Sequence, residues 1–408
     1  MRNHDAAAGP MGLEEAVKLL KRETLPLGRV QSVPLPEALG RTLAERVFAT
    51  HDQPPFPRSP LDGYAVIGED TDGAAAESPV TLKVIAEVDA GDVFADTLQP
   101  GEAVRIMTGA PVPNGANAVI RQENTDYGED QVRLYRSVRP WQNYVFQGED
   151  YKEGHLLVRP GACLDASTIA VLASLGLESV TVVQRPRALV ISTGSELQHP
   201  GEPLKPGRIY DSNLFMLQAQ LKDWGVDVAE AICCQDDPAL VEDYIRSRQE
   251  EVDLIFTTGG VSVGKRDIMH EVFRDLKVEK MIGGLAIKPG SAVLCGKYRG
   301  KWLLALSGNP YASFVGLQLL ARPILCGLTG NDALKMVYVN AALADSYDKA
   351  SPLRRFVRAY LQEGLVYLEG HTGGNGDVAS GLHINALLDI PAGTKAMEAG
   401  SRASVWLL

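Results

Sequence analysis

The strongest constraint on the fold is a series of largely apolar runs between residues 185 and 330. Each run has the length of a strand and is apolar at neighbouring positions, so both of its faces must be covered, as in parallel sheets flanked by helices. Segments with helical spacing separate the runs. The apolar runs are residues 188–193, 226–234, 252–258 and 302–307. The helical segments are residues 213–224, 238–249, 266–276 and 310–325. We predict an α/β domain with a mainly parallel sheet over residues 185–330.

A second region, residues 51–147, has the pattern of a small β module. It begins with HDQPPFPRSP (51–60), whose four prolines exclude a helix or a central strand. Short strand signals separated by turns such as Asn114-Gly115 follow. These signals are residues 64–67, 80–88, 102–107, 118–122 and 131–135. We expect this module to be inserted into another domain.

The remaining parts complete a multidomain α/β plus β chain. Residues 1–50 and 148–184 are predicted to form one discontinuous, elongated α+β domain around the insertion. It would contain a helix beginning near Leu13 and another over residues 166–175. Residues 331–408, with strand-like runs at 355–361 and 404–407, are expected to form a C-terminal β-barrel.

Composition excludes several classes of function. The net charge of −11 argues against a nucleic-acid partner. The longest apolar stretches are strand-sized and no secretory signal precedes them, so no membrane is expected. The five cysteines contain no Cys-x-x-Cys pair, which favours a reducing, cytoplasmic setting and no structural zinc. The adjacent Cys233 and Cys234 are expected to be buried packing residues.

The loops that follow the apolar runs predict an anion-binding site. In an open α/β sheet, ligands bind beyond the carboxyl ends of the strands. Three such loops contain TGSE (193–196), TTGGVSVGKRD (257–267) and SGNP (307–310). Glycine allows the backbone to approach a ligand and turn its N–H groups inward, and helix starts add a positive dipole end. The glycines concerned are Gly259, Gly260 and Gly264.

Acidic residues in these loops need a different explanation, because carboxylates repel an anion. Glu196, Asp236 and Asp267 are compatible with a phosphate ligand if Mg²⁺ bridges them to its oxygens. Asp237, just before Pro238, is interpreted as a helix N-cap. For Asp267 we favour a ligand role over capping. The histidines have no metal-ligand spacing.

Lys288 lies in LAIKPGSAV (285–293), between two strand-like pieces and before a Pro-Gly turn. Two interpretations stay open at this point. The lysine is either a compact cation directed at an oxyanion, or an ordinary lysine that extends its amino group to solvent from a sheet edge.

These segments together resemble the molybdopterin molybdenumtransferase family, to which the C-terminal domain of gephyrin belongs. The resemblance covers residues 12 to 330 and is vaguer beyond, where Arg358 and residues 376–380 look similar. The motifs that carry it are SPLDGYAV (59–66), RIMTGAPVP (105–113), QGED (147–150), STGSEL (192–197), RIYDSN (208–213), TTGGVSVGKRD (257–267), LAIKPG (285–290) and SGNP (307–310).

The resemblance implies an activity and its components. Such an enzyme inserts molybdate into adenylylated molybdopterin and releases AMP, assisted by Mg²⁺, as a homodimer in which the β module of one protomer faces the α/β domain of the other. Molybdopterin adenylyltransferase and molybdoenzyme apoproteins are implied as further partners. The catalytic residues would be Asp62, Glu196, Asp236, Asp267 and Lys288, the three middle ones also binding metal. Substrate-binding residues would be Thr108, Thr193, Gly194, Gly259, Gly260, Ser262, Gly264, Pro289, Gly290, Ser307, Gly308 and Asn309.

Departures from the family pattern concern positive charge. The family commonly has a proline at the position of Ser307, a lysine at Gly284 and a cation at Ser291. Lys265 and Arg266 are candidates to compensate for the missing charge. The pattern does not distinguish molybdate from tungstate, and a tungstate-preferring transferase or a non-catalytic molybdopterin-binding scaffold are the alternative functions.

Overall fold

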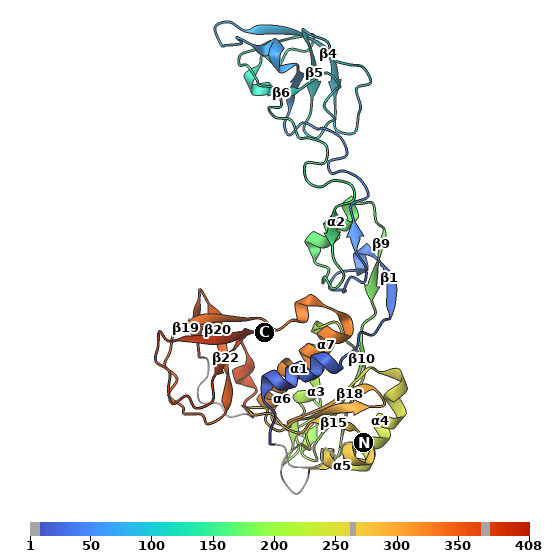
Figure 1. Cartoon of the computed structure of the whole chain (residues 1–408), viewed down its shortest axis with the longest axis vertical. Coiled ribbons are helices and arrows are strands. Elements are labelled where there is room, and N and C mark those ends of the chain that lie inside the picture. The colour runs from blue at the N-terminus through green and yellow to red at the C-terminus, as the bar shows by residue number, and fades with distance from the viewer. Residues whose placement is uncertain (1–8, 262–266, 369–375) are drawn as a thin grey trace. The chain divides into compact units, whose positions relative to one another are not determined.

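The computed structural model describes residues 9–261, 267–368 and 376–408 (Figure 1). The chain divides into two compact units. Unit 1 comprises Met1–Glu45, Pro160–Ile169 and Glu178–Leu408, and unit 2 comprises Arg46–Arg159 and Ala170–Leu177. Helix α2 (Ala166–Ser174) contributes residues to both.

The central sheet of unit 1 has six strands in the order β13-β10-β14-β18-β17-β15. The first four are parallel, and β17 and β15 are antiparallel additions that the sequence pattern did not predict. All five residues of β14 are buried, whereas β13, at the edge, is partly exposed along its length. The strands are β10 (Arg187–Thr193), β13 (Asp227–Cys234), β14 (Leu254–Thr258), β15 (Glu279–Ile282), β17 (Leu294–Tyr298) and β18 (Lys301–Leu306).

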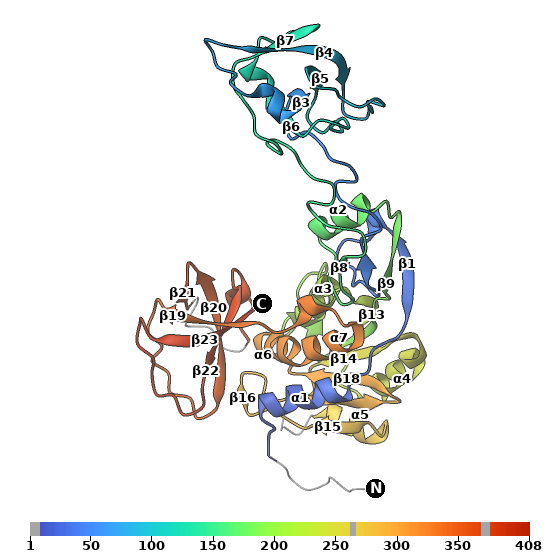
Figure 2. The same cartoon turned by 45° about the horizontal axis from the view of Figure 1, so that its top comes forward.

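Helices cover both faces of this sheet, as the alternation along β10 shows. Ala188 and Val190 lie in a core shared with α3 and α6, whereas Leu189 and Ile191 lie in a second core with α4 and α5. Figure 2 shows these helices around the sheet. Their bounds are α3 (Asn213–Asp223), α4 (Pro238–Arg248), α5 (Ile268–Asp275) and α6 (Pro310–Gly316). The predicted α/β domain is confirmed.

One continuous helical stretch, Pro310–Thr329, is apolar enough to span a membrane by length and composition. It consists of α6, a π-helical segment (Leu317–Ala321) and α7 (Arg322–Thr329). The expectation that the longest apolar stretches are strand-sized is therefore wrong here. In the structure 72% of the apolar window is buried, so we interpret the stretch as a core helix of unit 1.

Helix α1 (Leu13–Glu23) and a C-terminal barrel complete unit 1. Leu13, Ala16 and Leu20 join the core that contains Leu320 and Ile324 of the long helix. A two-stranded sheet pairs β1 (Val30–Pro34) with β9 (Ser179–Val183). The barrel is closed by the pairing of β20 with both β21 and β22, as predicted for this region. Its strands are β19 (Tyr338–Leu343), β20 (Arg354–Gln362), β21 (Leu365–Tyr367), β22 (Ala386–Ile390) and β23 (Arg402–Leu407), with β16 (Ile287–Lys288) added beside β20.

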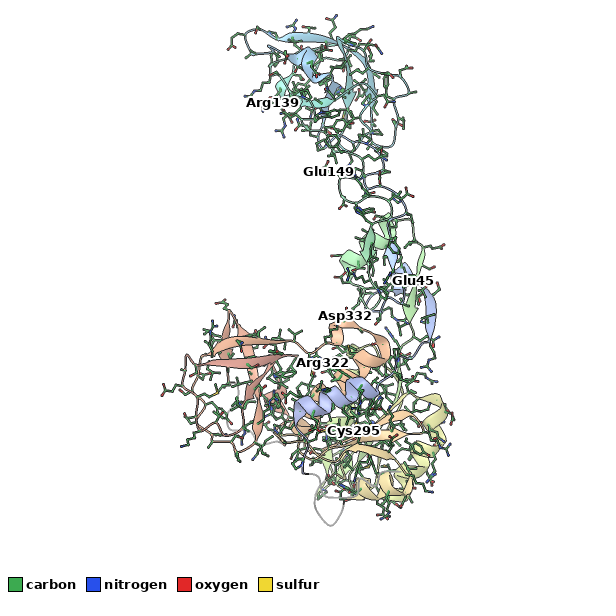
Figure 3. All side chains as sticks on the ribbon, viewed as in Figure 1. Glu45, Arg139, Glu149, Cys295, Arg322 and Asp332 are labelled. Atoms are coloured by element: carbon green, nitrogen blue, oxygen red, sulfur yellow. The ribbon has the colours of Figure 1, made fainter. Side chains whose placement is uncertain are left out.

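Buried Arg322 connects α7 to the start and the end of the barrel region (Figure 3). Its guanidinium donates hydrogen bonds to the backbone carbonyls of Leu334, Lys335 and Leu407, over 3.4, 3.2 and 3.1 Å. Burial lowers the pKa of Arg322. The three carbonyls compensate for part of the lost hydration of the charge.

Unit 2 contains a five-stranded sheet in the order β6-β3-β5-β4-β7. Every strand predicted from the sequence is present within one residue of its expected bounds. The strands are β3 (Gly63–Val66), β4 (Val80–Val88), β5 (Glu102–Ile106), β6 (Ala118–Arg121) and β7 (Gln131–Leu134). Gly63 is required by close packing, because a Cβ there would lie 1.9 Å from the carbonyl oxygen of Ile120. Strands β2 (Val47–Phe48) and β8 (Leu156–Val158) pair where the chain enters and leaves this unit.

Candidate functional site

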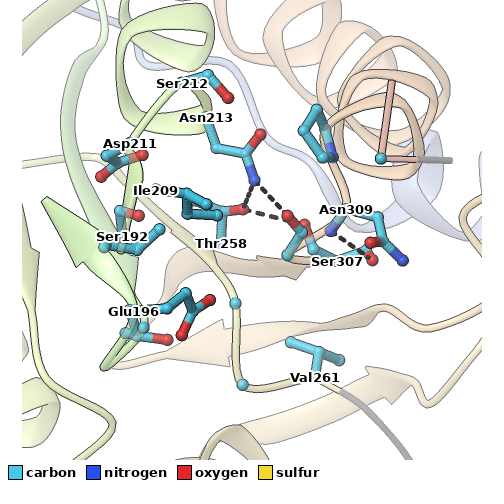
Figure 4. Close-up of a pocket in the computed structure, with 18 of the residues that line it drawn as sticks. Ser192, Glu196, Ile209, Asp211, Ser212, Asn213, Thr258, Val261, Ser307 and Asn309 are labelled. Carbon is cyan, nitrogen blue, oxygen red and sulfur yellow. Dashed lines mark hydrogen bonds between the residues drawn. The ribbon is translucent and has the colours of Figure 1, made fainter. Parts of the chain in front are cut away.

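A cavity of about 650 Å³ lies at the carboxyl ends of β10, β14 and β18 (Figure 4). This is the sheet edge at which the sequence predicted a ligand. Its lining residues all belong to unit 1. They are Ser192, Thr193, Gly194, Glu196, Leu197, Ile209–Asn213, Asp236, Thr258–Val261, Ala292, Ser307–Pro310, Gly376 and Val378.

Two glycines after β14 are required by the backbone. Gly259 and Gly260 have φ of +98° and +63°, and a Cβ at Gly259 would lie 2.1 Å from the carbonyl oxygen of Thr193. The prediction that Gly259 turns its N–H to a ligand is wrong, because this N–H donates to the carbonyl of Leu306 at 3.1 Å. The N–H of Gly194 likewise donates to Cys234. Neither is available to an anion.

A network of buried side chains joins the loops of the pocket. The Nδ2 of Asn213 donates to the carbonyl of Gly308 at 2.7 Å and to Oγ1 of Thr258 at 3.0 Å. Thr258 in turn donates to the carbonyl of Ser307 at 3.0 Å (Figure 4). The start of α3 is thereby fixed to the loops after β14 and β18. Beside it, the N–H of Asn309 donates to Oγ of Ser307, and Pro310 occupies the first turn of α6 as predicted.

Three buried oxygens on the pocket wall have no hydrogen-bond partner among the described residues. They are Oδ2 of Asp211, Oδ1 of Asn213 and Oγ1 of Thr193, in residues that are 2%, 7% and 4% exposed. The other Asp211 oxygen accepts the N–H of Leu214 at 3.0 Å, near the start of α3. A buried polar atom without a partner is costly, so a ligand group that donates a hydrogen bond to it would be favoured.

Asp211 and Asn213 are site residues that the sequence pattern did not predict. Both belong to the RIYDSN segment, which follows the two-residue strand β12 (Ile209–Tyr210) paired with β11 (Leu197–Gln198). This small sheet has no apolar run that would reveal a strand end. The polar triplet at 211–213, which overlaps the start of the predicted helix at residue 213, was the available signal.

The three acids proposed as metal ligands differ in position. Exposed Glu196 lines the pocket, and so does Asp236, whose Oδ2 accepts the N–H of Ser195 at 3.1 Å. Asp267 is the N-cap of α5 and does not line the pocket. Its Oδ2 lies 2.7 Å from Nδ1 of His270. Within residues 9–261, 267–368 and 376–408, no group of three His, Cys, Asp or Glu residues could hold a metal ion.

The predicted cation is also outside this pocket. Lys288 is exposed at the end of β16, and neither it nor Pro289 or Gly290 lines the cavity. The described lining contains no lysine or arginine. Gly284 and Ser291 do not line it either. Ser262, Gly264, Lys265 and Arg266 lie outside the described residues.

The helix-capping prediction for Asp237 is confirmed, since its side chain accepts the N–H of Ala239. The packing prediction for the neighbouring cysteines is wrong for Cys233, which is exposed. Partial burial of the thiol group, and then the charge of Asp211, nevertheless raise the pKa of Cys233 to about 12. Its thiol is therefore protonated at neutral pH.

Asp62 and Thr108 belong to unit 2 and contact each other there. The N–H and the hydroxyl of Thr108 both donate to Oδ1 of Asp62, each at 2.7 Å. These bonds, the hydroxyl first, lower the pKa of Asp62 below its ordinary value. The pair is thus a preset negative charge near the surface of the unit.

Three sequence families match consecutive parts of the chain. The "MoeA N-terminal region (domain I and II)" matches residues 11–176, the "Probable molybdopterin binding domain" matches 189–326, and the "MoeA C-terminal region (domain IV)" matches 340–408. The second of these contains most of the residues that line the pocket.

Similar proteins align over nearly the whole chain. A molybdopterin molybdenumtransferase of Staphylococcus epidermidis is 34% identical over 98% of this chain and 96% of its own length. One from Staphylococcus aureus is 33% identical over the same shares. The crystal structure of the molybdopterin biosynthesis moeA protein from Pyrococcus horikoshii OT3 has a TM-score of 0.86 at 31% identity, covering 98% of this chain and all of that one.

Proposed function

This chain belongs to the molybdopterin molybdenumtransferase family, and on that premise we propose that it inserts molybdate into adenylylated molybdopterin with release of AMP. The membership makes it a transferase of molybdenum cofactor biosynthesis. The observation that carries the substrate proposal is the 650 Å³ cavity, which is lined by polar groups of several loops. A cavity of this size is large enough for a small organic ligand such as a pterin.

Substrate anions would lie along the loops after β14 and β18. No described residue accepts a hydrogen bond from the N–H of Gly260 or of Gly308, so both can donate to a phosphate oxygen. Gly259 supports this role through its conformation, which brings the loop against Thr193. In this proposal, backbone N–H groups bind the phosphates and acidic side chains bind a cation.

We include Mg²⁺ in the proposal, with two of the three predicted acids as its protein ligands. Glu196 and Asp236 both line the pocket, and Mg²⁺ commonly takes one or two carboxylates together with phosphate oxygens and waters. The described residues thus fit a cation held jointly by protein and substrate. Bound there, Mg²⁺ would neutralise phosphate charge. Asp267 would contribute its negative charge from the N-cap of α5, with its carboxylate positioned by His270.

We further propose that the active enzyme is a cytoplasmic homodimer in which Asp62 and Thr108 serve the site of the second subunit. The composition supports the cytoplasmic setting, since none of the five cysteines is in a disulfide. Family membership supports the dimer. A two-fold dimer would supply each pocket with one preset carboxylate from unit 2.

The test is release of AMP from adenylylated molybdopterin by the purified protein. We expect release that requires both Mg²⁺ and molybdate, and the same assay with tungstate measures anion preference. A Glu196→Gln variant should lose activity, whereas Glu202→Gln, at an exposed glutamate outside the pocket lining, should not. Binding of molybdopterin without any AMP release would instead support a non-catalytic scaffold.

A further inference from the structure

The wall of the pocket contains buried hydrogen-bond acceptors that no strong donor among the described residues occupies. Asp211 and Asn213 line the cavity, and Oδ2 of the first and Oδ1 of the second are buried oxygens with no hydrogen-bond partner among the described residues. The orientation of the Asn213 amide is fixed, because its Nδ2 already donates to Gly308 and Thr258. Oδ1 is therefore an acceptor and cannot be exchanged for the amide nitrogen.

Asp211 is held in place by its other oxygen. Oδ1 accepts the N–H of Leu214, which fixes the carboxylate at the start of α3. The neighbouring Cys233 thiol stays protonated, because burial and the Asp211 charge raise its pKa to about 12. A thiol is only a weak donor, so it leaves most of the acceptor capacity of Asp211 unused. Asp211 therefore requires a stronger donor, and no described lining residue is a lysine or arginine.

A phosphate cannot be that missing group, because phosphate oxygens are acceptors and would be repelled by a buried carboxylate. The ligand part beside Asp211 must carry N–H donors. The surroundings also indicate its shape, since Ile209, Leu197 and Val261 place apolar surface on the same cavity. A flat heterocycle with an amino group satisfies both requirements.

We propose that Asp211 and Asn213 determine specificity for the pterin ring by accepting N–H donors from its amino-pyrimidinone edge. This inference rests on the proposed function, because it identifies which part of that substrate occupies the acceptor wall. A 2-amino-4-oxopteridine carries adjacent donors at its 2-amino group and N3, which suit a carboxylate and an amide oxygen. The adenine of the adenylyl group also carries an amino donor, so the experiment must separate the two rings.

The experiment compares the binding of pterin and lumazine to the full chain by fluorescence titration, at a pH where both rings are neutral. Lumazine differs from pterin in having a carbonyl oxygen in place of the 2-amino group. We expect the protein to bind pterin about ten to a hundred times more tightly, the effect of a hydrogen bond to a charged group. Equal affinities, or no saturable binding of pterin, would overturn the proposal.

Substitution then assigns the preference to Asp211. Asp211→Asn keeps an acceptor for the N–H of Leu214 and should reduce the preference for pterin to within about threefold. Asp223→Asn makes the same charge change at the exposed far end of α3 and should leave the preference intact. An unchanged preference in Asp211→Asn refutes the assignment. If that variant does not fold, Asp211→Glu, which retains the charge but displaces it, must weaken pterin binding.

A competition experiment with AMP tests whether adenine, and not the pterin ring, binds beside Asp211. AMP should not displace pterin, and Asp211→Asn should not weaken AMP binding. Displacement of pterin by AMP together with loss of AMP affinity in the variant would place adenine at Asp211 and overturn the proposal. AMP release from the full substrate is measured in parallel. If the wild-type protein releases AMP but binds pterin and lumazine equally well, the inference alone is contradicted. If the wild-type protein prefers pterin but releases no AMP, the proposed function alone is contradicted.

Discussion

The pocket of unit 1 and the Asp62–Thr108 pair of unit 2 place carboxylates in opposite states. In the pocket, Asp211 is buried and one of its oxygens has no partner among the described residues. In unit 2, Asp62 is partly exposed and already accepts two hydrogen bonds at one oxygen. An unpartnered buried acceptor costs roughly 1–3 kcal/mol, which binding of a donor can recover. The first arrangement favours a ligand that donates hydrogen bonds, and the second stabilises the charged form of a carboxylate.

The largest test asks whether the two regions act in one active site across a dimer. Asp62→Asn and Glu196→Gln should each be inactive, and co-expression of the two should restore activity. A mixed dimer would contain one site with both lesions and one intact site. With random pairing about half of the dimers are mixed, so roughly a quarter of all sites should recover. AMP release measures this, with mixed dimers isolated through two different tags.

AMP release recovers only if the Asp62 and the Glu196 of each active site come from different subunits. If both belonged to the site of one chain, every site in the mixture would keep a lesion. Absent activity in tagged mixed dimers would therefore contradict the shared site. Co-expression of Asp236→Asn with Glu196→Gln is the matched control and should not recover, because both residues line the same pocket.

The next largest effect is expected at Asp267. It tests whether this residue acts in the reaction through its charge or serves only as a helix N-cap. Asparagine caps helices about as well as aspartate, so Asp267→Asn should leave the melting temperature nearly unchanged. If the charge serves the reaction, AMP release should fall by about a hundredfold or more. Asp237→Asn, at the N-cap of α4, is the control and should stay active. Wild-type turnover in Asp267→Asn would reduce this residue to a helix cap.

A smaller effect is expected at Lys288, which is exposed and outside the described pocket lining. If it contacts a substrate oxyanion, Lys288→Ala should raise the KM for molybdate or for the pterin substrate about ten- to a hundredfold. Lys280→Ala, at an exposed lysine of β15, should leave both values unchanged. Identical KM values in the two variants would make Lys288 an ordinary surface lysine.

The smallest predicted effect concerns the preset charge of unit 2. Thr108→Val removes the hydroxyl bond to Asp62 but keeps the backbone N–H bond. The pKa of Asp62 should rise toward its ordinary value, because the larger cause of its lowering is lost. Asp62 must stay ionised, so activity should be lost at a higher pH when the solution is acidified. The measurement is kcat/KM against pH, with Thr97→Val as an exposed control. An unshifted acid limb would contradict the role of Thr108.

The fold could be predicted where burial imposes a simple pattern. β14 is buried along its length because helices cover both of its faces, and its first three residues are apolar. The strands of unit 2 were predicted because clear turns separate short alternating runs. Prediction failed for β15 and β17, whose sequences EKMI and LCGKY contain charged residues and a glycine in place of an apolar run. It also failed where strands have two or three residues, as for β12 and β21. Such strands depend on tertiary contacts that local pattern does not contain.

The candidate site was predicted in position but less well in detail. Strand ends located the pocket, and Glu196, Asp236 and the Gly259–Gly260 turn line it. Hydrogen-bond state could not be predicted, since it depends on neighbours brought together by the fold. Thus the N–H of Gly259 is taken by Leu306, and Asp211 is left with an unused acceptor. The roles of Asp62, Asp267 and Lys288 stay predictions until the variants are measured.

The packing of α1 has a consequence for biosynthesis on the ribosome. Leu13, Ala16 and Leu20 are buried against the helix that begins at Pro310, which is synthesised almost 290 residues after α1 ends at Glu23. At a synthesis rate of about 5–20 residues per second, about 15–60 s pass before the helix that covers the apolar face of α1 is made. Most of unit 2, a continuous stretch from Arg46 to Arg159, emerges complete during that interval. A nascent chain stalled before residue 310 should therefore carry a folded β module and an α1 accessible to chaperones.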